Sequence, residues 1–274
     1  MQYLTATVSR IGNREQNQDR VAVLEQQDTV LLVLGDGLGG RPGGEVAAET
    51  LIRIATQKFN QQAIPIQKPA AFMQDLLITA HKTIVEQGRL LTPPINPGTT
   101  AVLCLIQQGH AWWTHVGDSR LYLFRNGQLV ERTQDHSVVE NMLAGGSLTS
   151  ADSGGHPLRN VVTRCLGMTD NPPIVTISQK ISLKVGDIML LCSDGLWEPL
   201  GDQSLCRNLY DGKLQDALAA MAERAENINT PQSDNVSAVA LQVMSLSLRT
   251  RSLPLAKSAR RTNIGVKGKG PAQN

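Results

Sequence analysis

The sequence predicts an α+β protein in which antiparallel sheets carry helices on their outer faces. Strand-like and helix-like segments do not alternate regularly along the chain, as they would in a doubly wound parallel sheet. The stretch 99–133 is typical of consecutive antiparallel strands, and its Asn126-Gly127 pair is a strong signal for a two-residue hairpin turn. The 274 residues, 41% of them hydrophobic, are enough to bury a core without disulfides.

The first ninety residues predict three strands followed by two helices. The strands are expected at 3–9, 20–25 and 29–35, the last of which is almost wholly aliphatic. Helical periodicity follows at 43–60 and 70–88. Prolines separate the two helices and end the second one.

The middle of the chain predicts two long strands that turn near Gly109, and two more that turn at Asn126-Gly127. Residues 136–144 are expected to form a short helix. The remaining segments with a pattern are two strands, a helix and a last strand, expected at 173–180, 187–193, 213–228 and 235–243.

Two segments have no periodic pattern. Residues 145–172 are rich in Gly, Ser, Pro and Asp, and so long an irregular stretch is usually functional or mobile. Residues 246–274 contain seven Lys or Arg and no acidic residue, which leaves 19 basic and 24 acidic residues elsewhere. We interpret this tail as disordered and solvated, with an electrostatic tether to an acidic partner, nucleic acid or anionic lipid as the alternative. We do not expect nucleic acid to be the main partner.

Several protein classes are disfavoured by the composition. The N-terminal residues lack a basic stretch followed by an apolar one, so we expect no secretory signal. No run of eighteen apolar residues occurs, so we expect no membrane span. The four cysteines form no C-x-x-C pair and are expected to be reduced and packed. We therefore expect a cytoplasmic protein that acts as a monomer.

The loop 35–40, Gly-Asp-Gly-Leu-Gly-Gly, fits the G-x-G-x-x-G pattern of dinucleotide-binding folds. The carboxylate of Asp36 would repel a pyrophosphate, however, and no acidic residue follows about twenty residues later at the tip of a second strand. A Walker loop would need a Gly-Lys-Ser or Gly-Lys-Thr tripeptide, which does not follow. The match is therefore a weak indication of nucleotide binding.

Five aspartates lie at the ends of apolar strands. Asp36, Asp118 and Asp194 follow such strands, whereas Asp19 and Asp234 precede them. A single aspartate of this kind is most often a turn residue. Five carboxylates gathered at one end of a sheet repel one another unless a cation lies among them. Since all the donors are oxygens, the pattern predicts Mg²⁺ or Mn²⁺ rather than zinc.

Other metal and catalytic patterns fit less well. His110 and His115 are five residues apart on a strand and therefore point to opposite faces. His81 is expected to lie on a helix as a surface or packing residue. The Ser233-Asp234-Asn235 triplet matches the S-D-N of penicillin-recognising enzymes, but the S-x-x-K and K-T-G that those enzymes need are absent.

Seven stretches, in this order, resemble the metal-dependent protein phosphatases (the PPM family, type 2C serine/threonine phosphatases) in their short bacterial form. They are GNREQNQD (12–19), GDGLGGRPGGE (35–45), PGTTAV (97–102), VGDSRLYLFRNGQL (116–129), TQDHS (133–137), DIMLLCSDGLWE (187–198) and SDNVSAVAL (233–241). The resemblance implies a four-layer α/β/β/α sandwich of two antiparallel sheets packed face to face. It also implies one catalytic domain over 1–245, in which 145–172 is the mobile flap segment beside the site.

The resemblance also implies metal ligands. Asp36 would bridge two ions, and the carbonyl group of Gly37 would bind one of them. Asp194 and Asp234 would complete the protein ligands of the second ion. Asp19 would hydrogen-bond to metal-bound water from a second layer of residues.

The implied reaction is the metal-dependent hydrolysis of phosphoserine and phosphothreonine in proteins. A hydroxide that bridges the two Mn²⁺ or Mg²⁺ ions would attack phosphorus without a covalent enzyme intermediate. Arg14 would bind the substrate phosphate through its planar fork, and together with Asp36 it is the expected catalytic pair. Asp118, with Asp194, would hold a third ion.

The sequence departs from the family pattern at the expected proton donor. Leu38 stands where eukaryotic members often have a histidine, and Arg41 stands where many bacterial relatives have one. His136 is a candidate for the general acid by residue type alone, with structural packing as the alternative role for this residue. Metal-bound water is another candidate for the proton donor.

The expected partners are phosphorylated proteins, among them a serine/threonine kinase or the substrates of that kinase. Two other functions stay open on the sequence alone. One is an inactive relative that binds phosphoproteins as a scaffold. The other is a phosphatase for a small phosphorylated metabolite, for which a deep and closed pocket would be expected.

Overall fold

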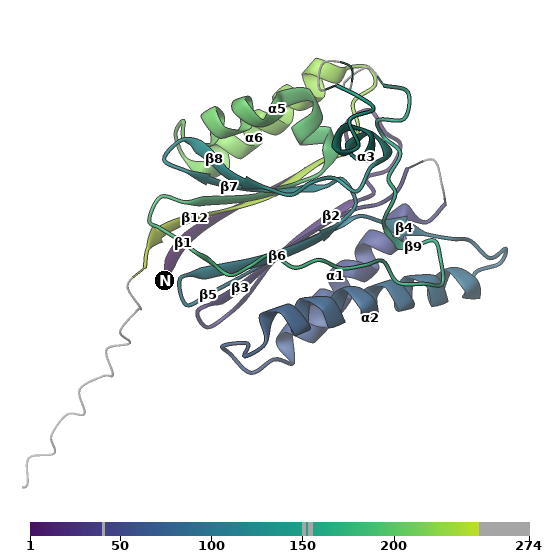
Figure 1. Cartoon of the computed structure of the whole chain (residues 1–274), viewed down its shortest axis with the longest axis horizontal. Helices are drawn as coiled ribbons and strands as arrows, with labels where there is room; N and C mark the ends of the chain where they lie inside the picture. Colours follow the sequence, from purple (N-terminus) through teal and green to yellow (C-terminus); the bar gives the residue numbers. More distant parts are fainter. Residues whose placement is uncertain (40–41, 150–151, 153–155, 247–274) are drawn as a thin grey trace, which may run out of the picture.

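The computed structural model describes residues 1–39, 42–149, 152 and 156–246. Two five-stranded antiparallel sheets pack face to face, and pairs of helices cover both outer faces (Figure 1). This arrangement confirms the predicted α/β/β/α sandwich. The predicted tail lies almost wholly outside the described residues.

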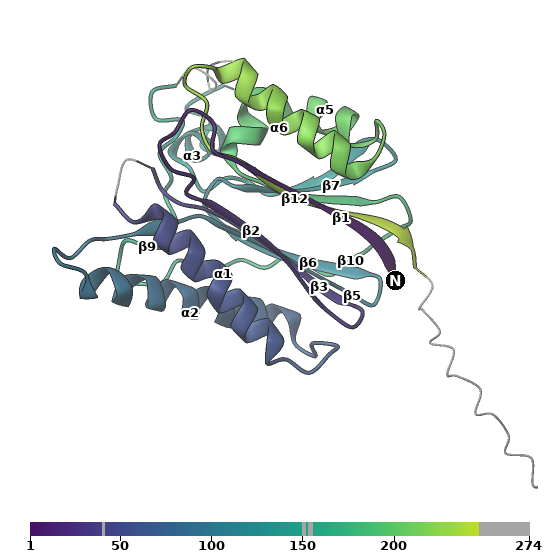
Figure 2. The ribbon, with the colours of Figure 1, turned by 180° about the vertical axis from the view of Figure 1, so that it is seen from behind.

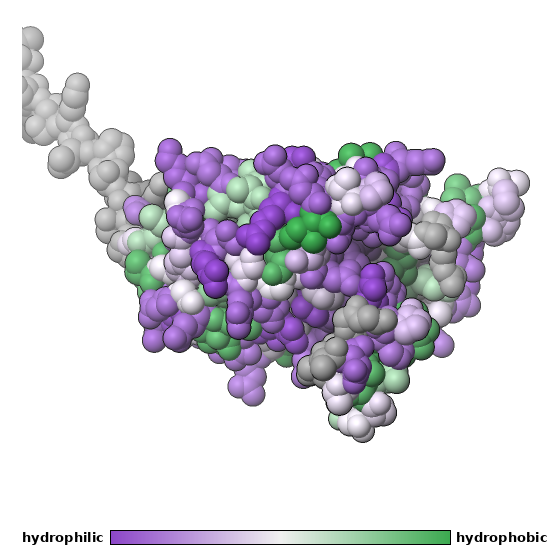
Figure 3. Space-filling model, turned by 90° about the horizontal axis from the view of Figure 1, so that it is seen from above, coloured by the Kyte–Doolittle hydropathy of each residue, from purple (hydrophilic) through white to green (hydrophobic). Residues whose placement is uncertain are grey.

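The first sheet is covered by α5 (Asp194–Leu209) and α6 (Leu214–Asn229). Its strands, in spatial order, are β1 (Gln2–Arg10), β12 (Val236–Ser245), β11 (Ile188–Cys192), β7 (Arg120–Arg125) and β8 (Gln128–Arg132). Most exposed positions of α6 carry polar or charged side chains, and the outer face over these helices is mainly hydrophilic (Figure 3).

The second sheet is covered by α1 (Gly44–Asn60) and α2 (Pro69–Leu90). Its strands, in spatial order, are β10 (Ile181–Ser182), β6 (His110–Val116), β5 (Ala101–Gln107), β3 (Thr29–Asp36) and β2 (Asp19–Gln26). Figure 2 shows these helices beneath the sheet, with the other helical layer on the far side of the sandwich.

Burial on both faces explains the unbroken apolar runs of the central strands. In β3, Leu31 and Val33 pack against the helices, while Leu32 and Leu34 pack against the other sheet. Strand β12 alternates in the same way between the helical layer and the layer between the sheets. Exposing these long aliphatic stretches to water would be unfavourable, and the strands therefore lie at the centre of the molecule.

The predicted hairpin turn is confirmed. Asn126 and Gly127 join β7 to β8 with positive φ angles of 51° and 71°, as a tight turn between twisted strands requires. The short helix predicted at 136–144 is also present, as α3 (Val138–Ala144).

The strand predicted at 173–180 was wrong. In this segment Ile177 forms only an isolated bridge to Thr114, and β10 starts at Ile181. Side chains replace part of the ladder, since the Oγ atom of Ser178 accepts a hydrogen bond from the amide of Trp113. Pro172 precedes the segment and Pro173 is its first residue, and neither can donate to a ladder, so continuous pairing does not develop there.

Helix α5 was not predicted. Pro199 and Gly201 lie inside it, and Gly201 has φ 71° and ψ 158°, so the helix is kinked and its sequence lacks a continuous apolar stripe. The packing of Leu196, Leu205 and Leu209 against the first sheet holds the two halves in one element.

Residues 150, 151 and 153–155 of the flap segment lie outside the described residues, and its described part is only partly regular. It leads from α3 to β9 (Leu166–Gly167), which pairs with β4 (Gly98–Thr99) in a separate two-stranded sheet. The four cysteines are free thiols, and three of them are buried. None of the helices in the described part of the chain has the length and apolar character needed to cross a membrane.

Candidate functional site

The five predicted aspartates come together at one end of the sandwich, near β4 and β9. Asp19 and Asp36 are direct partners in the register of β2 and β3. Asp118 lies in the turn from β6 to β7, Asp194 starts α5, and Asp234 precedes β12. A cavity of about 610 Å³ is lined by all of them except Asp19, and also by Arg14 and Gly37. Asp19 is only 2% exposed and interacts with the carboxylate of Asp36.

The loop after β3 places Asp36 at the cavity through backbone contacts. The carbonyl oxygen of Asp36 accepts hydrogen bonds from the amide of Thr100 (2.8 Å) and the hydroxyl group of Thr99 (2.9 Å). The amide of Gly37 donates to the carbonyl group of Gln18. A Cβ atom on Gly37 would lie 2.4 Å from the backbone of Gly44, so the glycine allows α1 to start directly beside the loop.

The carboxylates of Asp36 and Asp194 are in strongly unfavourable surroundings for negative charge. Burial raises the pKa of Asp36 well above its usual range, and the charges of Asp19 and Asp194 raise it further. Burial followed by the charges of Asp118 and Asp234 has the same effect on the pKa of Asp194. Among the described residues, no positively charged side chain offsets the raised pKa of either group.

The pKa values of Asp19 and Asp118 are also raised. Burial raises the pKa of Asp19 to about 6, although its Oδ2 atom accepts a hydrogen bond of 2.8 Å from Ser193. The Oδ1 atom of Asp19 is buried without a hydrogen-bond partner. Burial, with a further contribution from Asp135, raises the pKa of Asp118 to about 6.

Arg14 lies at the open rim of the cavity. Its guanidinium group donates a 2.7 Å hydrogen bond to the Oδ2 atom of Asp234, and their side chains are 53% and 41% exposed. This contact differs from the expected contact with a substrate phosphate. Because the pair is exposed, its own contribution to stability is small, and Arg14 can exchange one anionic partner for another at little cost.

Asn235 organises the chain that carries Arg14. Its side chain accepts a hydrogen bond from the amide of Gln18 and donates to the carbonyl groups of Ile11 and Gln16. Sequence reasoning gave Asn235 no role, although the SDN stretch contains it. Ser193, Thr99 and Thr100 were missed in the same way, because their partners are far away in the sequence.

No group of three or more His, Cys, Asp or Glu side chains within the described residues is placed to hold a metal ion as it stands. The donor chemistry nevertheless fits a hard divalent cation, because the described residues that line the cavity include carboxylates but no His or Cys. The unpartnered oxygen of Asp19 and the raised pKa values of its neighbours are the surroundings that such a cation would stabilise.

The candidates for a proton donor differ in their positions. Leu38 lines the cavity, and Arg41 lies outside the described residues. The ring of His136 stacks on His115 at 4.4 Å, and its Nδ1 atom accepts a hydrogen bond from the amide of Gly117. Burial, followed by the charge of His115, lowers the pKa of His136 to about 4, so packing accounts for this residue.

Comparisons with known proteins agree on one family. The family model described as Protein phosphatase 2C matches residues 8–238. The serine/threonine phosphatase stp of Listeria monocytogenes serotype 4b is 30% identical over 186 residues, covering 67% of this chain and 73% of that relative. A crystal structure of the Mycobacterium tuberculosis serine/threonine phosphatase PstP has 27% identity and a TM-score of 0.78, covering 89% of this chain and 99% of that one. The catalytic domain of PstP in complex with two manganese ions has 27% identity, a TM-score of 0.76 and the same coverage.

Proposed function

The chain belongs to the protein phosphatase 2C family, as the sequence resemblance predicted, and we propose that it hydrolyses phosphoserine and phosphothreonine in proteins. The observation that carries this proposal is the convergence of Asp36, Asp118, Asp194 and Asp234 on a cavity that also contains Arg14. These residues come from widely separated parts of the chain. Their mutual repulsion has no structural benefit, which favours a functional reason for their arrangement.

The proposed ligands are those expected from the sequence. Asp36 would bridge two ions, Gly37 would bind one, and Asp194 and Asp234 would bind the other, with Asp19 behind them. When Mn²⁺ or Mg²⁺ is bound, it supplies Lewis-acid activation of water and neutralises phosphate charge. A relative of this chain binds two manganese ions. Asp118 with Asp194 is proposed for a third ion.

The protein's own contribution is to position the phosphate. Arg14 offers a planar guanidinium group that can hold two phosphate oxygens at once. Its exposed pair with Asp234 would be replaced when Asp234 turns to a cation and a phosphate approaches. The backbone of Asp36 would stay in place meanwhile, because it accepts hydrogen bonds from Thr99 and Thr100.

Protein substrates are favoured over small metabolites by the shape of the site. The rim residues Arg14 and Asp234 are substantially exposed, so the phosphate site opens to solvent. A second cavity, of about 410 Å³, shares Leu38 and Gly39 with the first and runs along the flap segment. Such a continuous groove can accept the residues that flank a phosphorylated side chain, whereas a closed pocket would be expected for a metabolite.

The proposed partners are phosphorylated proteins, including a serine/threonine kinase or its substrates. We propose that residues 1–245 form the single catalytic domain and that it acts as a monomer in the cytoplasm. The scaffold alternative would require a site that binds phosphoproteins without turning them over.

Hydrolysis of a phosphothreonine peptide tests this function directly. Wild-type protein with Mn²⁺ is expected to release phosphate, and either a chelator or Asp36→Asn is expected to abolish turnover. Asp75→Asn is the matched control, because Asp75 is an exposed aspartate on α2 that pairs with Lys58 and should leave the rate unchanged. Full activity in the presence of chelator would refute the metal-dependent mechanism, and peptide binding without turnover would favour the scaffold.

A further inference from the structure

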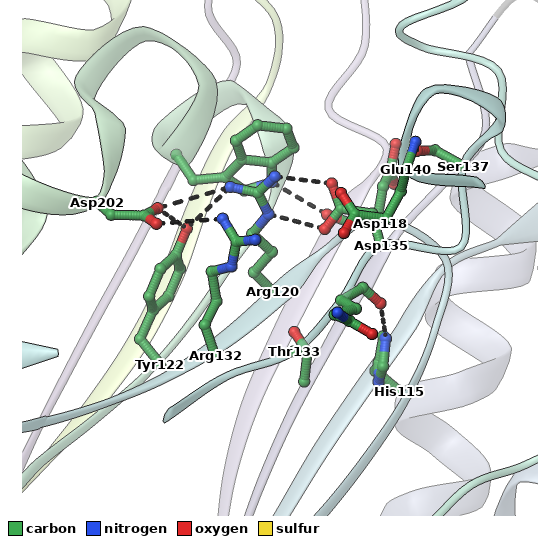
Figure 4. Close-up of polar contacts among 12 residues, drawn as sticks. His115, Asp118, Arg120, Tyr122, Arg132, Thr133, Asp135, Ser137, Glu140 and Asp202 are labelled. Carbon is green, nitrogen blue, oxygen red and sulfur yellow. Dashed lines mark hydrogen bonds and ion pairs between the residues drawn. The ribbon is translucent and has the colours of Figure 1, made fainter. Parts of the chain in front are cut away.

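Strand β7 starts with Arg120, two residues after Asp118, and the side chain of Arg120 is almost completely enclosed. Its guanidinium group forms two hydrogen bonds with the carboxylate of Asp135, of 2.8 and 2.7 Å, and both side chains are about nine-tenths buried (Figure 4). The Cζ atom of Arg120 also lies 3.3 Å from the ring centroid of Trp197. Arg120 is therefore clamped between a carboxylate and an aromatic face.

Trp197, the aromatic residue of this clamp, connects Arg120 to two of the proposed metal ligands. The indole Nε1 atom of Trp197 donates a 3.0 Å hydrogen bond to the backbone oxygen of Asp118. Trp197 lies in the first turn of α5, three residues after Asp194. The packing of Arg120 on Trp197 therefore helps to set the backbone positions of Asp118, to which Trp197 is hydrogen-bonded, and of Asp194, which starts the same helix.

The carboxylate side leads to the flap segment. Asp135 precedes His136, whose amide donates to the carbonyl group of Gly117 and whose carbonyl group accepts from the amide of Thr163 at 2.7 Å. The amide of Val138 likewise donates to the carbonyl group of Val161. Residues 160–164 of the flap segment border the cavity through Asn160 and Val162. The position of Asp135 therefore affects residues 136–138, to which residues 161–163 of the flap segment are hydrogen-bonded.

A second set of contacts anchors Arg120 from the other side. The hydroxyl group of Tyr122 accepts a hydrogen bond from Arg120 and donates one of 2.9 Å to Asp202, which also pairs with Arg132 (Figure 4). A buried ion pair of this kind is weak evidence for stability, because an apolar replacement is often as stable. Its distinctive property is a defined geometry, which the planar fork and the stacking of arginine provide and lysine does not.

We propose that Arg120 is a positioning residue that couples the Asp118 turn and the start of α5 to residues 160–164 of the flap segment. The inference rests on the proposed function for its catalytic meaning, but the coupling itself is a property of the metal-free protein. Arg120 acts on the Asp118 turn and α5 through Trp197, and on the flap segment through Asp135. It does not contact the substrate.

Hydrogen exchange in metal-free protein is the first test. In Arg120→Lys, the amides of Val138 and Thr163 are expected to exchange about tenfold faster, because the bidentate pair that holds their partners is lost. Arg125→Lys is the matched control. Arg125 forms the same bidentate pair with Asp187, of 2.8 and 2.7 Å, at the opposite end of β7, far from the flap segment. Equal effects of the two variants on these amides would overturn the proposal.

Metal titration is the second test. Arg120→Lys is expected to raise the Mn²⁺ concentration for half-maximal activity about tenfold, since second-layer changes typically have effects of that size. Trp197→Phe keeps an aromatic ring but removes the indole donor to Asp118, so it is expected to shift the Mn²⁺ dependence and leave the Thr163 amide protected. Arg125→Lys should change neither property. Normal Mn²⁺ dependence in Arg120→Lys would also contradict the proposal.

Two further outcomes are separated by this design. If Arg120→Lys does not fold, Asp135→Asn tests the same pair with an isosteric change, and unchanged exchange at Thr163 in that variant would overturn the coupling. If the wild-type protein has no phosphatase activity, the proposed function fails, whereas the exchange measurements still decide whether Arg120 couples the two regions.

Discussion

Gly37 shows how one residue decides between two readings of a motif. The glycines of the loop 35–40 resemble a phosphate-binding pattern, but Gly37 is required because α1 passes too close for any side chain. The amides of Gly37 and Leu38 donate to the carbonyl groups of Gln18 and Gly98, and Asp36 lines the cavity. Its chemistry is therefore that of an oxygen-ligand site.

Gly37→Ala is expected to be destabilising by about 3 kcal/mol, since the new methyl group would overlap the backbone of Gly44 and force the loop and helix apart. Urea unfolding measures this change. Gly39→Ala, in the same loop, is the control, because the nearest atom to its Cβ would be the end of a flexible glutamine at 3.7 Å. Its effect should stay within about 0.5 kcal/mol. Equal costs for both variants would contradict the packing argument.

His136 is expected to make the protein less stable in mild acid. Its pKa is about 4 in the folded state, against an ordinary value of 6.5, because burial and then the charges of His115 and Arg164 disfavour its protonation. Between these values the unfolded chain binds more protons, so the free energy of unfolding falls as the pH is lowered from about 6.5 to about 4.

Urea unfolding at pH 7 and pH 5, with chelator present, measures this effect. The loss of stability between the two values should be smaller in His136→Gln than in the wild type. His110→Gln, at the far turn of β6, should behave like the wild type. Asp19 and Asp118 have raised pKa values and therefore contribute to the pH dependence of stability in the opposite direction. Both aspartates are present in the wild type and in both variants, so the difference between these proteins reports on the histidine alone.

At the scale of elements, Asn235 ties the segment between β1 and β2 to the start of β12. Asn235→Ala leaves three backbone partners unsatisfied and is expected to be destabilising by about 3 kcal/mol. Because that segment carries Arg14, KM for a phosphopeptide should rise more than kcat falls. Asn208→Ala is the control, since the side chain of Asn208 bonds to Ser204 one turn earlier in its own helix, and the change should cost about 1 kcal/mol without a change in KM. An unchanged KM in Asn235→Ala would show that Arg14 does not depend on this anchor.

The elements that were predicted correctly share a strong local signal. The aliphatic run of β3 and the Asn126-Gly127 turn were evident because burial on both faces and a positive φ angle each demand particular residue types. The elements that were mispredicted lack such a signal. The halves of α5 are joined across Gly201 by packing alone, and the 173–180 segment has strand-forming residues but meets only part of its neighbour β6.

At the scale of the whole molecule, the two sheets bring five repelling carboxylates to one end of the sandwich. The metal-free fold should therefore be strained there, and a divalent cation should relieve the strain. Ligand binding at about 100 times Kd contributes about 2.7 kcal/mol, which corresponds to a rise in Tm of about 5–10 °C for a domain of this size.

Thermal unfolding with Mn²⁺ or with chelator measures this linkage. The wild type should gain the full shift, and Asp36→Asn should gain little. In chelator alone, Asp36→Asn should melt above the wild type, because one buried charge has been removed. The same Mn²⁺ shift in both proteins would mean that the cation binds elsewhere.

The sequence determined the positions of the aspartates relative to the strands, because a carboxylate at the end of an apolar strand leaves a pattern along the chain. It also determined the layered architecture through the periodicity of the elements and their order. Convergence of the carboxylates on one cavity, the capture of Asp234 by Arg14 and the clamp around Arg120 were decided only by the tertiary structure. These features depend on contacts between residues up to 220 positions apart, whose distances are set by sheet packing rather than by local conformational preference.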